Sequence, residues 1–327
     1  MRRPDARMLG LLAASIALAV TAVAQERYPA RPIRLVIPSV PAGVHDVIGR
    51  VWAEKVKPQL GIVVIDNRGG GGGLIGANDV AHAQPDGYSI LLGSTTTHVL
   101  LTPAMANPPY DPVRDFSAVA VFAASSTSVV INASVPARTL AELISYAKAN
   151  PGKLSYGSAG NGSITNLAGE LFKLRASGLD IVHVPYKGIG QGVSDLIGGQ
   201  IPMLSANATA QILDLHRAGK IRILAVNAAQ RLGAAPDIPT AIEQGVPDMI
   251  GLLFLGLFAP AATPKPILDR IAAATHAAMA DAEFQKVLTA SGLEAIPDSD
   301  SEKAKRFMDE EIARWGPVVK ASGFKVE

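Results

Sequence analysis

The segment with the clearest chemical potential in this chain is a short loop, residues 37–46, which reads IPSVPAGVHD. An apolar run at 33–37 precedes it, and apolar residues at helical spacing begin at Val47, with Asp46 placed as a helix cap. This pattern predicts a strand, a loop and the start of a helix. The first turn of a helix carries backbone N–H groups without intrahelical partners, and the aligned peptide dipoles favour an anion there. The loop is therefore a candidate site for a small anion, and it needs no arginine or lysine.

A second loop of the same character, residues 156–165, reads YGSAGNGSIT. Ser163 is placed to cap the helix that follows, so one interpretation is simply a polar turn. That interpretation is compatible with binding, because a cap residue leaves neighbouring N–H groups free for a ligand. Two such loops facing each other would enclose a small anion.

Three further polar residues are candidates with two open interpretations each. Ser94 and Thr95 follow the third predicted strand and are placed like a third binding loop, although hydroxyl groups at a strand end often only cap a helix. His45 lies inside the first loop. It is either a solvated loop histidine or a donor to a ligand carboxylate.

Catalytic and cofactor sites find little support in the sequence. Residues 71–76, GGGLIG, match the G-x-G-x-x-G pattern of dinucleotide sites, but a run of glycines matches it by chance. The next strand ends at Gly93-Ser94, where a dinucleotide site needs an acidic residue for the ribose. The 6 histidines lack H-E-x-x-H spacing and there is no cysteine, and we find no nucleophile–base pair. We therefore expect no enzyme activity, no cofactor and no metal.

The first residues read as a secretory signal peptide, residues 1–24. Three arginines precede an apolar stretch at 8–20, which is shorter than the roughly 20 residues of a membrane span, and Ala22-Val23-Ala24 is typical of a cleavage site. The absence of cysteine suits an oxidising compartment such as the periplasm. The formal net charge of +2 gives no sign of a nucleic-acid partner.

Strand and helix patterns alternate along the rest of the chain, which indicates an α/β fold with a mostly parallel sheet covered on both faces. Apolar crossovers at 116–132 and 251–258 divide the chain into lobe 1, residues 25–125 plus 251–327, and lobe 2, residues 126–250. In lobe 1 we predict strands at 33–37, 62–66 and 88–92, and helices at 74–83, 267–279, 282–291 and 301–320. In lobe 2 we predict strands at 154–156, 181–184 and 221–226, and helices at 140–149, 164–174 and 193–197. Two lobes joined by two crossings imply a hinge, with a ligand between the lobes at the carboxyl ends of the strands.

Several segments together resemble the Bug family, the periplasmic substrate-binding proteins of tripartite tricarboxylate transporters. Each motif is weak alone, whereas their joint order is specific and covers the whole mature chain. The motifs are YPARPI at 28–33, the first loop, DNRG at 66–69, PDGY at 85–88, GSAGNGS at 157–163, HVPYKG at 183–188, DLIGGQ at 195–200, LAV at 224–226, PT at 239–240, and FAP at 258–260 followed by TP at 263–264.

The resemblance implies a periplasmic binding protein-like fold of two lobes that captures a small carboxylate and delivers it to a two-subunit membrane permease. The protein would be a monomer. A carboxylate would be held mainly by backbone groups of the two loops, with Asn207 at the distal end of the ligand. The implied contacts are Ser39, Val40, Ala42, Gly43, Val44, His45 and Asp46 in the first loop, and Ser158, Asn161, Gly162 and Ser163 in the second.

Two other functions stay open at this point. The same lobe closure would serve a sensory module that presents a bound carboxylate to a membrane receptor. A secreted dinucleotide-dependent enzyme would instead use the glycine-rich segment. Val44-His45 stands where the family usually has a small residue and Thr, which leaves the identity of the ligand open.

Overall fold

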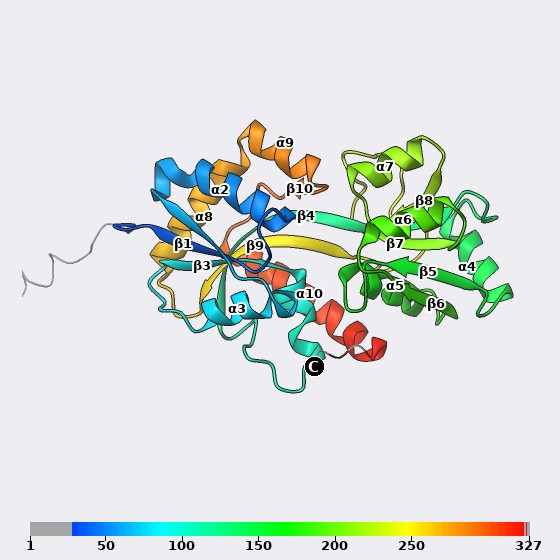
Figure 1. The fold of residues 1–327 in the computed structure, drawn as a ribbon, viewed down its shortest axis with the longest axis horizontal. Helices are drawn as coiled ribbons and strands as arrows, with labels where there is room; N and C mark the ends of the chain where they lie inside the picture. The colour runs from blue at the N-terminus through cyan, green and yellow to red at the C-terminus, as the bar shows by residue number, and fades with distance from the viewer. Residues whose placement is uncertain (1–27, 324, 326–327) are drawn as a thin grey trace, which may run out of the picture.

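Two lobes lie side by side in the computed structural model, which describes residues 28–323 and 325 (Figure 1). The strands that join them are β4 (Phe116–Asn132) and β9 (Leu252–Pro260). The predicted signal peptide, residues 1–24, lies outside the described residues. In the described part of the chain, no helix has the length and apolar character needed to cross a bilayer.

Lobe 1 is built on three parallel strands, in the spatial order β2-β1-β3, which β9 and β4 extend in antiparallel orientation. One apolar core packs three helices on one face of the sheet, and a second core packs the remaining helices on the other face. The strands are β1 (Ile33–Ile37), β2 (Val63–Asn67) and β3 (Ser89–Ser94); α2 (Val44–Leu60), α8 (Lys265–Met279) and α9 (Ala282–Ala290) cover the first face, and α3 (Leu74–Ala81) and α10 (Ser301–Ser322) the second.

Lobe 2 has the same layered plan around a second set of strands. Parallel strands β7, β5 and β6 continue the sheet beyond β4, and β8 pairs with β4 as well. The strands are β5 (Leu154–Ser158), β6 (Ile181–Pro185), β7 (Met203–Asn207) and β8 (Ile221–Val226); the helices are α4 (Leu140–Ala149) and α5 (Ile164–Arg175) on one face, and α6 (Ile189–Ile197) and α7 (Ala210–Arg217) on the other.

Short elements complete the chain. Two short 3₁₀ turns are η1 (Gly71–Gly73) and η3 (Thr102–Ala104), and η2 (Thr96–Leu100) is a short π-helix. Strand β10 (Glu294–Ala295) pairs with β4. The C-terminal helix α10 begins in lobe 1 but also contacts α5 of lobe 2, so it braces the two lobes on one side.

The two crossovers differ from the expectation of a mostly parallel sheet. Strands are parallel within each lobe but antiparallel where β4 and β9 run between the lobes. Residues 116–132, where we placed the first crossover, contain two apolar runs separated by small polar residues and form the single strand β4. The hydroxyl groups in its middle fit because they find backbone partners: Thr127 Oγ1 donates to Gly251 O (3.0 Å) and Ser128 Oγ to Ala206 O (2.9 Å).

Candidate functional site

The first loop connects β1 to α2, and its position follows from the sheet. Because β1 ends at Ile37 on the side of lobe 1 that faces lobe 2, the loop lies at the gap between the lobes (Figure 1). The helix begins at Val44 with Gly43 as its N-cap. The prediction that Asp46 is the cap residue was therefore wrong, because the helix starts three residues earlier than predicted and Asp46 lies in its first turn.

Asp46 nevertheless holds the loop. Its Oδ2 accepts hydrogen bonds from the Ala42 N–H and from Arg50 Nε, each at 2.9 Å. Ala42 needs this support, because its φ of 63° is a left-handed conformation that costs a non-glycine residue free energy. Arg50 Nη2 also donates to Asn67 Oδ1 (3.3 Å), and Asn67 Nδ2 donates to Ser39 O (3.4 Å). The loop is thus tied to β2 as well as to its own helix.

The ion pair also sets the charge of the site. The hydrogen bond from Arg50 lowers the pKa of the buried Asp46 carboxyl to about 2, so this group is ionised at neutral pH. Arg50 balances its charge locally. A carboxylate in the first turn would otherwise repel an anion, so this pairing keeps the helix terminus attractive to a negative ligand.

The first turn of α2 presents unused donors. Val47 N–H bonds to Gly43 O, whereas the N–H groups of Val44, His45 and Asp46 have no partner among the residues that the structure describes. His45 is half-buried, and burial lowers its pKa to about 4, so its ring is neutral at pH 7 and offers one further donor. This turn has the chemistry of an anion site.

The second loop lies between β5 and α5 in lobe 2. Its cap was predicted correctly: Ser163 Oγ accepts the Asn166 N–H at 3.1 Å. Most of its other donors are already used. Ala159 N–H bonds to Thr165 Oγ1 (2.9 Å) and Gly162 N–H to Asn166 Oδ1 (3.0 Å), and the Gly160 N–H bonds to Ser158 Oγ (3.1 Å).

Fewer free donors remain in the second loop than we expected. Asn161, which is exposed, has an N–H without a partner among the described residues, as do Ile164 and Thr165 in the first turn of α5. Ser158 is fully buried, and Ser163 is half-buried. The backbone N–H groups of Asn161, Ile164 and Thr165 are thus the parts of this loop that can still donate to a ligand.

The expected third loop is not a surface feature in this conformation. Thr95 is fully buried, and its Oγ1 donates to Leu252 O and accepts from the Phe254 N–H, both at 2.9 Å. Ser94 lies inside β3, opposite Leu255. Both residues join β3 to the crossover strand β9 in this structure, and their contact with a ligand stays a prediction. Asn207, at the end of β7, is half-buried, and its Oδ1 has no hydrogen-bond partner among the described groups.

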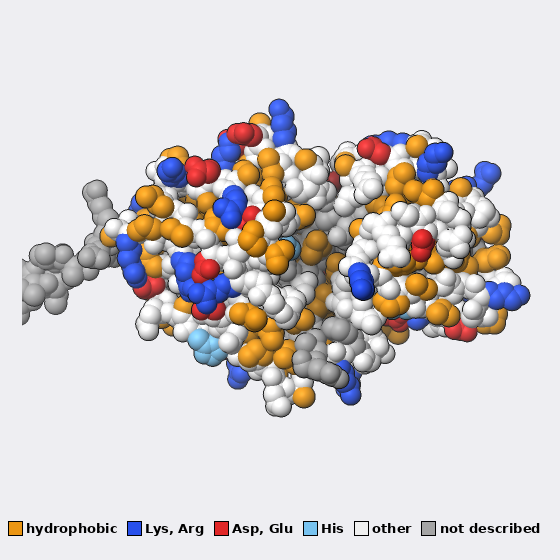
Figure 2. Space-filling model, viewed as in Figure 1, with side chains coloured by type: hydrophobic (Ala, Val, Ile, Leu, Met, Phe, Trp, Pro, Cys, Tyr) orange, Lys and Arg blue, Asp and Glu red, His pale blue; other side chains and the backbone are white. Residues whose placement is uncertain are grey.

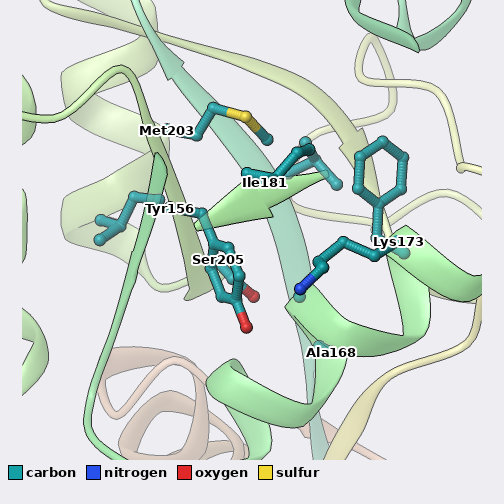
Figure 3. A pocket seen from close by; sticks show the side chains of 10 residues that line it. Tyr156, Ala168, Lys173, Ile181, Met203 and Ser205 are labelled. Atoms are coloured by element: carbon teal, nitrogen blue, oxygen red, sulfur yellow. The ribbon is translucent and has the colours of Figure 1, made fainter. Parts of the chain in front are cut away.

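A groove separates the lobes, and the ends of β1 and β5 approach it from opposite sides (Figures 1 and 2). Beside the crossover strands, a cavity of about 190 Å³ lies between α7 and the segment around β10; its lining includes Ser125, Ala208 and Leu293. By contrast, a pocket inside lobe 2, between Tyr156, Met203 and the core, has a volume of only about 10 Å³, room for about one water molecule (Figure 3).

The glycine-rich segment has a packing role in the structure. A Cβ on Gly73 would lie 3.1 Å from Pro38 O, and one on Gly76 would lie 2.8 Å from Arg68 O. These glycines let η1 and α3 approach the first loop closely, as a tight connection requires. Within the described chain, no group of three or more acidic or histidine side chains is arranged to hold a metal ion.

One pair that the sequence did not reveal is Ser158 and His183, whose Oγ and Nε2 atoms lie 2.7 Å apart. The expectation of no nucleophile–base pair was therefore wrong in geometry. Ser158 has no exposed surface, so no substrate can reach its hydroxyl in this conformation. The sequence also gave no sign that Arg50, Asn67, Thr165 and Asn166 hold the two loops. The motifs DNRG and HVPYKG contain Asn67 and His183 but do not indicate what these residues contact.

Comparison with known proteins identifies the family of the chain. The family model described as "Tripartite tricarboxylate transporter family receptor" matches residues 48–324. Protein BugT of Bordetella pertussis is 33% identical over 98% of this chain and 99% of its own length. Among solved structures, R. palustris Rpa4515 with adipate has a TM-score of 0.71 at 33% identity and covers 91% of this chain and 99% of its own.

A second solved structure is a TctC solute binding protein from Polaromonas with no ligand. Its TM-score is 0.82 at 26% identity, and the match covers 90% of this chain and 99% of the other. The fold is therefore that of periplasmic binding proteins, as the motifs predicted. The chain belongs to the tripartite tricarboxylate transporter receptor family, a family of periplasmic solute-binding proteins.

Proposed function

We propose that this protein binds a small organic acid in the groove between its lobes and delivers it to the membrane permease of a tripartite tricarboxylate transporter. The observation that carries the proposal is the first turn of α2, where three adjacent N–H groups lack partners beside a neutralised Asp46–Arg50 pair. Donors fixed in advance stabilise an anion at little reorganisation cost. The adipate bound to Rpa4515, a relative of similar length, supports a carboxylate as the anion.

The ligand carboxylate would contact the first loop, Ser39 to Asp46, and the second loop from Ser158 to Ser163, with Asn207 toward its distal end. His45 would donate to the carboxylate through its neutral ring. Membership of a receptor family supports a binding role without catalysis. In this proposal the protein acts as a monomer in the periplasm, after its signal peptide is removed.

We further propose that the two lobes, divided near residues 125 and 251, close over the ligand. The TM-score is higher with the ligand-free relative (0.82) than with the adipate-bound one (0.71), although the sequence identity is lower (26% against 33%). A difference in lobe orientation, which sequence identity does not measure, would explain why the TM-score is higher for the ligand-free relative. The conformation described above would then be an open one, and closure would bring the second loop to the anion.

Thermal unfolding of the protein from Gln25 onward tests the proposal. The panel contains adipate, succinate, citrate, benzoate, a neutral amide and a nicotinamide dinucleotide. A ligand at 100 times its Kd stabilises the folded state by about 2.7 kcal/mol, which for a chain of this length raises Tm by roughly 5 °C. We expect such a shift with one class of carboxylate. A shift with the dinucleotide alone would contradict the proposal and point to the glycine-rich segment.

A further inference from the structure

Behind the second loop, a histidine on the neighbouring strand is hydrogen-bonded to the residue at which the loop begins. Ser158 is the last residue of β5, and its Oγ lies 2.7 Å from Nε2 of His183 on β6. The two strands are parallel, with Tyr156 opposite His183, so the imidazole reaches along the sheet toward the loop. Because Ser158 is fully buried, its hydroxyl contacts only protein groups.

The Ser158 hydroxyl fixes Gly160 in the loop. Its oxygen accepts the Gly160 N–H at 3.1 Å, and Gly160 O lies 3.3 Å away. That carbonyl already accepts the Ser163 Oγ–H (2.7 Å) and the Ser163 N–H (3.2 Å). The single Ser158 proton therefore has a better acceptor in His183 Nε2, and donating it there leaves the oxygen lone pairs for Gly160 N–H.

The imidazole is held by a rigid platform. Its ring stacks on Tyr156 with a centroid distance of 4.9 Å, and the Tyr156 hydroxyl donates to Glu170 Oε1 (2.6 Å) while accepting from Asn166 Nδ2 (3.0 Å). Tyr156 itself lies against the lobe 2 core (Figure 3). Asn166 also accepts the Gly162 N–H, so the same cluster supports the loop at a second point.

Burial, more than the neighbouring charges, lowers the pKa of His183. His183 lines an open depression of about 600 Å³ at the surface. Glu170 and Lys173 of α5 and Lys325 line the same depression. Burial lowers the pKa of His183, and Lys173 acts in the same direction against the opposing effect of Glu170. A neutral ring can present an unprotonated Nε2 to Ser158.

We propose that His183 is a positioning residue for the second loop. Through Ser158 it fixes Gly160, and thereby orients the unpartnered N–H groups of Asn161 and of the first turn of α5. The ligand part of this inference rests on the proposed function, whereas the ordering of the loop does not. The essential feature is a hydrogen-bond acceptor at the position of Nε2, which glutamine can supply and phenylalanine cannot.

Hydrogen exchange measured by mass spectrometry on the ligand-free protein tests the ordering directly. Loss of one hydrogen bond of about 1 kcal/mol corresponds to about a fivefold change in an opening equilibrium. We expect peptides spanning residues 159–163 to exchange about fivefold faster in His183→Phe and at nearly the wild-type rate in His183→Gln. Peptides spanning 39–46 should not change in either variant.

Two further variants separate positioning from general destabilisation. Ser158→Ala should loosen the same peptides, and adding His183→Phe to it should have no further effect, because the two residues act through one hydrogen bond. His216 is the control, since its Nδ1 accepts the Ile223 N–H within the same lobe. His216→Phe should leave residues 159–163 unchanged. Equal exchange in wild type and His183→Phe, no rescue by glutamine, or additive effects with Ser158→Ala would each overturn the proposal.

Adipate is the probe for the ligand part. If wild type binds it, we expect His183→Phe to weaken binding about fivefold and His183→Gln to restore it. A loosened loop with unchanged adipate affinity would overturn the link between loop order and binding. If adipate and the other carboxylates fail to bind wild type, the proposed function fails, while the exchange experiment still decides whether His183 orders the loop.

Discussion

The two loops that face the groove each connect a strand to a helix but use their backbone donors differently. In the first loop, the N–H groups of Val44, His45 and Asp46 stay free, and one side chain, Asp46, braces the turn through the Ala42 N–H. In the second loop, side chains of Ser158, Thr165 and Asn166 take up three N–H groups. A glycine- and serine-rich loop is thus not in itself an anion site, because its own hydroxyl and amide groups can satisfy it.

This difference suggests an order of events. Under the proposed function, the first loop would receive a carboxylate in the open protein, because its three free N–H groups are adjacent. The free N–H groups of the second loop are divided between Asn161 and the first turn of α5, and lobe closure would bring them to the ligand. We therefore expect changes in the first loop to reduce affinity most, and changes in the second loop to reduce it less.

Asp46→Ala should weaken ligand binding by roughly 10- to 100-fold, measured by calorimetry. The variant removes a charged acceptor worth about 1.5–3 kcal/mol, frees the Ala42 N–H and leaves Arg50 without its partner. Asp46→Asn keeps an acceptor, so its affinity for the ligand should lie between that of Asp46→Ala and that of the wild type. Asp281→Ala serves as the control. Asp281 caps α9, and its Oδ1 accepts hydrogen bonds from the N–H groups of Glu283 and Phe284. Equal affinity in Asp46→Ala and wild type would contradict the role of the first loop.

Ser163→Ala should reduce affinity only a few-fold and destabilise the protein by about 1 kcal/mol, as the loss of a helix cap does. Thr139→Ala is the matched variant, because Thr139 caps α4 in the same lobe by accepting the Glu142 N–H at 3.1 Å. Chemical denaturation should give similar losses of stability for both, and calorimetry should show weaker binding for Ser163→Ala alone. If Ser163→Ala weakens binding more than Asp46→Ala does, the second loop contributes more to affinity than the first, contrary to our expectation.

His45→Gln should have the smallest effect, visible mainly in the pH dependence of stability. The folded pKa of about 4 lies below the ordinary value of 6.5, so the unfolded chain takes up the proton first as the pH falls. The free energy of unfolding of the wild type should therefore decline between pH 6.5 and 4. The variant should decline less steeply, and buried His98, whose pKa is lowered to about 3, should account for part of the remaining slope. Identical slopes would show that His45 is not buried as described.

Much of the fold follows from local sequence patterns. The predicted helix at 140–149 and strand at 221–226 match α4 and β8 at both ends, because caps and apolar runs mark their limits clearly. The β7 strand was missed. It is only five residues long, MLSAN, and it ends in polar residues whose strand conformation depends on pairing with β4.

The site was predictable only in part, for the same reason. The first loop could be located because a strand end and a helix start are local signals. Thr95 could not be recognised as a structural residue, since its partners Leu252 and Phe254 are more than 150 residues away in the sequence. His183 reaches Ser158 only because β5 and β6 pair. Contacts made by strand pairing leave no periodic trace in the sequence.

The most direct test of the central claim is a backbone amide NMR titration with the carboxylate that stabilises the protein most. We predict the largest shifts at the N–H groups of Val44, His45 and Asp46, with smaller shifts at Asn161, Ile164 and Thr165. Unchanged signals at residues 44–46, with the main shifts elsewhere, would contradict the claim that the first turn of α2 holds the ligand.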